Sequence, residues 1–125
     1  MAANKVFRSG PVALTTTLTT NILNSNITSL SGPVGYTQTQ PYIILRHVRI
    51  TNVTSGAVTF TMAIGASGAT PSSSNAFMGF GTSIPANSYV DWYGMVRLDS
   101  TDFLVGGASA ATSLTFEAEG EIGLA

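Results

Sequence analysis

The chain has 125 residues, the usual size of one domain, and it contains no cysteine. Charged residues make up 9% of the sequence, against about 25% in ordinary soluble domains, and the formal net charge is −1. These values exclude thiol chemistry, thiolate metal sites and a broad basic surface. A free monomer usually carries more charge, so we expect a surface that is largely covered in an assembly. The alternative is a small neutral β-domain that is soluble enough alone.

Acidic residues are absent from the chain before Asp91, and all six acids lie after this point. The sequence has a single histidine, His47, in an apolar stretch between two arginines. Most enzymes draw acids, bases and nucleophiles from several parts of a fold. We therefore predict that the protein is not an enzyme, that it has no catalytic residues, and that His47 is a packed or partly exposed structural residue.

The N-terminal third is rich in Thr and Asn and contains Ser-Gly-Pro-Val twice, at 9–12 and 31–34. Its alternation is weak, so we predict an extended N-terminal arm with the first strands over 1–34. The β-sandwich then covers 35–125 in one domain overall. The backbone groups of such an arm can pair with another chain. Phe7 and Arg8 are therefore predicted to lie at a contact with a neighbouring subunit.

Two strands are predicted next, over 42–53 and 57–64, with a Thr-Ser-Gly turn between them. The two runs and their turn read as a hairpin. If the first strand is regular, Arg46 and Arg49 fall on opposite faces. Both faces are partly apolar, so we expect this strand to be covered on both sides.

A long Gly- and Ser-rich connection is predicted over 65–83, and it holds three large apolar residues, Phe77, Met78 and Phe80. If exposed, these side chains would form an adhesive patch. Either the loop folds back over the domain, or the three residues dock on another chain. They are therefore candidate interface residues, together with Phe7 and Arg8.

The last third reads as short strands separated by turns, at 89–93, 95–98, 103–105 and 112–124. Short strands at regular spacing, with no helix, predict an all-β fold: an antiparallel β-sandwich or jelly roll. Alternation along the last strand turns Leu124 inward and a row of carboxylates outward. The residues predicted to share one core are Val58, Phe60, Met62, Leu114, Phe116 and Ile122.

The outward row on the last strand consists of Glu117, Glu119 and Glu121. Alternate residues of a strand lie ~6.5–7 Å apart, which spreads the three carboxylates too far for one simple cation site. We expect a solvated edge, or ion pairs with Arg46, Arg49 or a neighbouring subunit, and leave cation binding open. No cofactor or metal site is predicted. The few cations predict no nucleic-acid partner, and no apolar run approaches the ~20 residues of a membrane helix.

From Ile50 onward the chain resembles a type of small bacteriophage virion protein. The resemblance rests on RITNVTSGAVTFTMAIG and on SIPANSYVDWYGMVRLDSTDFLVGGASAATSLTFEAEGEIGL. A turn after Asn52 leads into a Val-Thr strand, and an Ile-Pro-Ala-Asn-Ser turn leads into an aromatic strand. A Leu/Asp element follows at 98–104, with Thr-Asp where Gly-Asp is commoner, and then a Gly-x-Ala-Ser turn and a long final strand. Residues 1–40 have no counterpart.

The resemblance implies a capsid-decoration, fibre-base or tail-associated β-sandwich, and it transfers no site residues. We therefore expect a capsid decoration or cement protein on the outer surface of the virion. It would be made in the host cytoplasm, form a homotrimer and bind the major capsid protein. The alternatives are a head–tail connector or tail-associated protein and, from another class, a carbohydrate-binding module. In that module Trp92, Tyr36, Tyr89 and Tyr93 would stack on sugars.

Overall fold

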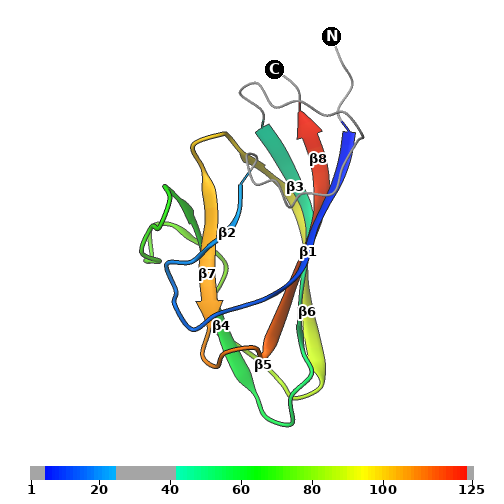
Figure 1. Ribbon diagram of the computed structural model, residues 1–125, viewed down its shortest axis with the longest axis vertical. Coiled ribbons are helices and arrows are strands. Elements are labelled where there is room, and N and C mark those ends of the chain that lie inside the picture. Colours follow the sequence, from blue (N-terminus) through cyan, green and yellow to red (C-terminus); the bar gives the residue numbers. More distant parts are fainter. Residues whose placement is uncertain (1–4, 25–41, 124–125) are drawn as a thin grey trace.

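The computed structural model describes residues 5–24 and 42–123, and the described chain is built from strands (Figure 1). None of its described segments forms a helix long and apolar enough to cross a membrane. The eight strands are β1 (Lys5–Ala13), β2 (Asn21–Leu23), β3 (Tyr42–Asn52), β4 (Val58–Gly65), β5 (Ala76–Ile84), β6 (Ser88–Leu98), β7 (Phe103–Ala108) and β8 (Leu114–Gly123).

These strands form two four-stranded sheets, ordered β1-β8-β3-β6 and β2-β7-β4-β5. All of the pairings are antiparallel. Figure 1 shows the two sheets as layers that face one another. The strands pair from the ends of the chain inwards: β1 is hydrogen-bonded to β8, β2 to β7, β3 to β6, and β4 to β5. We call this pattern nested strand pairing. The predicted all-β antiparallel sandwich is therefore confirmed.

The predicted hairpin between 42–53 and 57–64 is wrong, because β3 and β4 lie in different sheets. β3 pairs with β6 and β8, whereas β4 pairs with β5 and β7. Strand β3 ends at the fully buried Asn52, where the chain passes to the other sheet. The side-chain amide of Asn52 donates hydrogen bonds to the carbonyls of Gly56, Ile84 and Pro85. These bonds tie the β3–β4 connection to the β5–β6 turn, so the chain leaves one sheet and enters the other.

The core lies between the two sheets and is built from the inward residues of alternating strands. All six residues predicted to share one core are buried in it: Val58, Phe60, Met62, Leu114, Phe116 and Ile122. Leu124, also predicted to face inward, lies outside the described residues.

The segment predicted as an N-terminal arm belongs to the sandwich over its described part. Strand β1 pairs with β8 from Lys5 opposite Ile122 to Ala13 opposite Thr115, with one shift of register between Ser9 and Val12. Within β1, Phe7 is only 4% exposed and packs in the core. The remaining residues of the predicted arm, 1–4 and 25–34, lie outside the described chain.

The connection predicted over 65–83 contains a strand, β5, which pairs with β4. Its irregular backbone conceals the strand pattern, because Met78 and Gly81 have positive φ angles and the register with β4 shifts. Gly79 is needed in β5, because a Cβ atom there would lie 2.3 Å from the Phe60 ring. Gly79 and Gly81 therefore belong to a strand rather than to a loop.

A β-bulge in β3 changes which residues face the core. Leu45 and His47 lie opposite Gly120 and Glu119, so Arg46 is an extra residue relative to β8. Upstream of it Leu45 faces the core, and downstream Val48 does. Arg46 and Arg49 are consequently both exposed on the outer face. The prediction that these two arginines point to opposite faces is therefore wrong. So is the prediction that the strand is covered on both sides.

Candidate functional site

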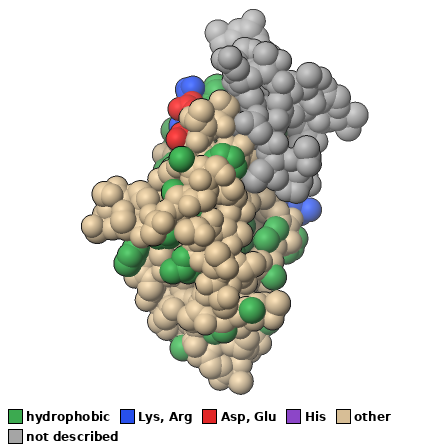
Figure 2. Space-filling view, turned by 60° about the vertical axis from the view of Figure 1, so that its left-hand side comes forward, with side chains coloured by type: hydrophobic (Ala, Val, Ile, Leu, Met, Phe, Trp, Pro, Cys, Tyr) green, Lys and Arg blue, Asp and Glu red, His purple; other side chains and the backbone are tan. Residues whose placement is uncertain are grey.

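Among the described strands, charged residues occur in only one of the two sheets. The strands β2, β7, β4 and β5 contain none, and Figure 2 shows a surface over them on which charged side chains appear only near the margins. We call the outward surface of this sheet the uncharged face. The outward side chains of the other sheet form the charged face, which carries Arg8, Arg46, Arg49, Asp91, Arg97, Glu117, Glu119 and Glu121.

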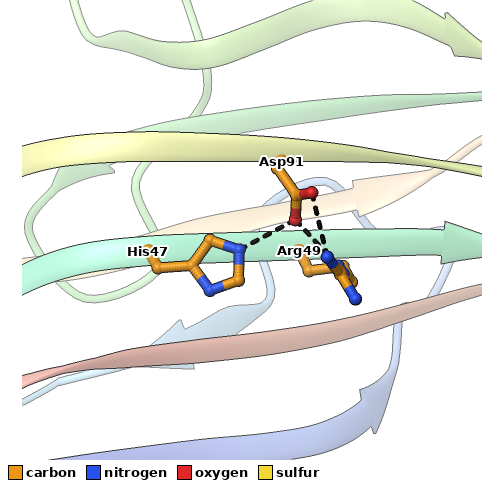
Figure 3. A network of polar contacts seen from close by, with 3 residues as sticks. All are labelled: His47, Arg49 and Asp91. Atoms are coloured by element: carbon orange, nitrogen blue, oxygen red, sulfur yellow. Dashed lines mark hydrogen bonds and ion pairs between the residues drawn. The ribbon is translucent and has the colours of Figure 1, made fainter.

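The centre of the charged face is a hydrogen-bonded cluster of His47, Arg49 and Asp91 (Figure 3). Asp91 lies on β6 directly opposite Arg49 on β3. Its Oδ1 lies 2.8 Å from Nε2 of His47 and accepts a hydrogen bond of 2.8 Å from Nε of Arg49, while Oδ2 accepts one of 3.0 Å from an Arg49 terminal nitrogen. The bulge at Arg46 makes the cluster possible, because it puts His47 and Arg49 on the outer face although Leu45, two residues before His47, faces the core.

Electrostatics fixes the protonation of this cluster. Hydrogen bonds from Arg49, and secondarily from His47, lower the pKa of Asp91 from 3.8 to about 2. The hydrogen bonds between Arg49 and Asp91 also raise the pKa of Arg49 further above its ordinary value. Asp91 is therefore an ionised acceptor at any ordinary pH, so Nε2 of His47 carries the proton that it donates to Asp91. In the neutral ring, Nδ1 is left as an acceptor.

Aromatic rings cover the cluster. The rings of His47 and Tyr93 stack with centroids 4.6 Å apart and planes 13° apart. The Tyr93 ring therefore covers one side of the imidazole. Tyr93 is 70% exposed. The guanidinium of Arg49 lies 4.5 Å from the ring centre of Tyr89, a cation–π contact.

A shallow hollow of about 320 Å³ adjoins the cluster on the side of β8 and β1. Gly120 and Phe7 line it together with His47, and side chains from three strands surround it. Arg46 and Glu121 form an ion pair of 2.7 Å at this position. The remaining residues lining the hollow are Val6 and Glu119.

The charged face offers fixed hydrogen-bonding groups and aromatic surface. Among the described residues, no group of three His, Cys, Asp or Glu side chains is placed to hold a metal ion. Within the same residues His47 bonds to Asp91 and to no serine or threonine hydroxyl. The predicted pairing of the glutamate row is confirmed for Glu121 with Arg46, whereas Arg49 pairs with Asp91.

The residues predicted to form an interface are dispersed. Phe7 belongs to the core, so its predicted contact with another chain is corrected by its burial. Arg8 is exposed on the charged face. Phe77 and Met78 fold back onto the core, and Phe77 contacts Trp92 edge-on at 4.9 Å. Phe80 is 57% exposed on β5 and remains open to a partner.

The predicted sugar-binding aromatic group is also separated. Trp92 packs against the core, on the face of β6 opposite Tyr89 and Tyr93. Tyr36 lies outside the described residues. The His47 cluster was not predicted, because it requires both the bulge and the β3–β6 register. The available signal was the alternation that puts Tyr89, Asp91 and Tyr93 on one face of their strand.

No protein-family model matches this chain, and no curated protein matches it.

Proposed function

We propose that this protein is a structural component of a bacteriophage virion that decorates the outer capsid surface and stabilises the shell. The observation that carries the proposal is the segregation of charge between the two sheets. A protein held on a shell needs one surface that loses its hydration water at a low cost in free energy and another surface that stays hydrated. The uncharged face suits the first role, and the charged face suits the second.

Physical chemistry favours the uncharged face as the docking surface. Removing a charged group from water costs several kcal/mol unless it is paired, whereas a hydroxyl costs less and can be hydrogen-bonded by the partner. Phe80 supplies exposed apolar area on β5, next to Thr61 of β4. A hollow of about 230 Å³ on the same sheet can receive a partner side chain; it is lined by Thr16, Leu18, Thr59, Thr61, Gly107, Ala108 and Ser109.

In this proposal the partners are the major capsid protein and two further copies of the chain, in a homotrimer. The nested strand pairing supports a jelly-roll form of the sandwich, a fold used in viral capsid proteins. A subunit that bridges neighbouring capsid proteins binds only the assembled shell. By linkage, such binding raises the free energy needed to rupture the shell.

The test is co-sedimentation of the protein with capsids that lack it. Replacement of Phe80 by Arg puts a charge into the proposed contact and should weaken binding by about tenfold or more, because an unpaired charge is desolvated there. Met95→Arg is the matched control, since Met95 is 67% exposed on β6 of the other sheet. Circular dichroism checks that both variants fold. Binding by Phe80→Arg at the wild-type level, or loss with Met95→Arg instead, would overturn the assignment of the docking face.

A further inference from the structure

We propose that the charged face is a binding site for a neutral oligosaccharide, centred on Tyr93 and the adjoining hollow. This inference concerns the sheet opposite the proposed docking face and does not depend on capsid binding. It rests on three observations: an exposed aromatic ring stacked on a hydrogen-bonded histidine, a hollow lined by hydrogen-bonding groups beside it, and equal numbers of described arginines and carboxylates on the outward side of the strands.

Tyr93 has the properties of a platform for a sugar ring. One side of its ring is stacked on His47, and the residue is 70% exposed, so the outer side is open. The apolar C–H face of a pyranose packs on such a ring as other apolar groups do. His47 is held by Asp91, which is held in turn by Arg49. The platform is therefore ordered before a ligand arrives, which lowers the entropic cost of binding.

The hollow beside the platform supplies partners for hydroxyl groups. Arg46 uses one terminal nitrogen in its ion pair with Glu121 and has further N–H groups on a side chain that is 49% exposed. Glu119 is exposed and adds carboxylate acceptors. The second ring nitrogen of His47 is turned away from Asp91 in Figure 3, towards the side of β8 on which the hollow lies. Donors and acceptors thus stand side by side, as vicinal hydroxyls require.

The charges on this face indicate a neutral ligand. Its described side chains include four arginines, Arg8, Arg46, Arg49 and Arg97, and four carboxylates, Asp91, Glu117, Glu119 and Glu121. The charges of these eight side chains cancel, so they give no excess of positive charge with which to attract a polyanion such as nucleic acid or an acidic polysaccharide. A ligand with many hydroxyls and no charge fits this balanced array.

The arrangement also favours an oligosaccharide over a single sugar. The platform and the hollow are two sites that meet at His47, which stacks under Tyr93 and lines the hollow. Consecutive sugar units can therefore occupy both at once. On a shell decorated as proposed above, many copies of the chain would in addition give avidity to weak individual binding.

The experiment uses the full chain on a microarray of neutral and acidic bacterial oligosaccharides, followed by calorimetric titration of the best ligand. We expect binding to neutral glycans. Tyr93→Ala should weaken the titrated affinity by about tenfold or more, whereas Tyr93→Phe, which keeps the ring, should remain within about threefold of wild type. Met95→Ala changes an exposed neighbour on the same strand and should leave the affinity unchanged.

Thermal melts of all three variants control for folding. Binding to no neutral glycan, binding to acidic glycans alone, or an unchanged affinity in Tyr93→Ala would each overturn the proposal. Co-sedimentation of Tyr93→Ala with capsids separates the two hypotheses, because this variant should bind the shell fully. Loss of glycan binding with shell binding intact supports both proposals, and an absence of glycan binding in the wild type refutes only this one.

Discussion

Asp91 organises the charged face, because a single carboxylate holds both His47 and Arg49. The three side chains come from two neighbouring strands, and Arg49 lies directly opposite Asp91 in the register. The pair is partly exposed, so its contribution to stability is limited by solvent screening. Its main consequence is positional: the carboxylate fixes the imidazole that supports Tyr93.

The shifted pKa of Asp91 predicts a specific pH dependence. Its folded-state pKa of about 2 lies below the ordinary 3.8, so the ionised carboxylate stabilises the folded protein. This contribution is complete above about pH 4 and is lost as the pH falls towards 2. Asp91→Asn should therefore be less stable than wild type at pH 7, and the difference should shrink between pH 4 and pH 2. Urea unfolding midpoints measured across this range provide the check.

The control for that series is Glu119→Gln, since Glu119 is exposed on the same face and forms no ion pair among the described residues. Its midpoint should follow wild type at every pH. If the difference in unfolding midpoint between wild type and Asp91→Asn stays the same down to pH 2, the role given to this carboxylate is contradicted.

At the scale of elements, β8 is a strand in which burial of the side chains follows the alternation of the sequence closely. Its inward residues are buried, and Phe116 is fully buried in the core. Phe116→Ala should lower the free energy of unfolding by about 3–5 kcal/mol, because it removes a large ring and leaves a cavity. Thr115→Ala, on the outward neighbour, should change it by less than about 1 kcal/mol. Denaturant unfolding of both variants tests the alternation, and equal losses would contradict it.

Strands with regular alternation could be predicted from the sequence, and irregular ones could not. The sequences of β8 and β4 alternate, so their large core residues follow from the period of two, although Thr61 and Ala63 of β4 are buried as well. The bulge at Arg46 cannot be read from β3 alone, because it is defined by the partner strand. The sheet change after Asn52 depends on long-range hydrogen bonds to Ile84 and Pro85, which a local turn pattern does not contain.

The candidate site was hidden for the same reason. His47 and Arg49 lie on the outer face only because the bulge at Arg46 shifts the alternation, and Asp91 reaches them only through the β3–β6 register. Regular alternation assigned Arg46 and Arg49 to opposite faces and left His47 without a partner. On β6, by contrast, the exposure of Tyr89 and Tyr93 follows directly from the period of two.

At the scale of the whole molecule, the sandwich has two outer faces with different chemistry. The uncharged face carries the exposed Phe80 and a hollow rich in hydroxyl groups. The charged face carries the Tyr93 platform and its charge-balanced surroundings. This division lets one face attach to a shell while the other meets the medium, and it accommodates both proposals without competition for the same surface.

A cryo-electron microscopy reconstruction of the virion that contains this chain tests the central claim most directly. The account predicts density for the sandwich on the outer capsid surface, in groups of three. The sheet β2-β7-β4-β5 should rest against the major capsid protein, with Phe80 in the contact and Tyr93 turned to the solvent. Density confined to the head–tail junction or the tail, no density for the chain on the particle, or a charged face lying against the shell would contradict it.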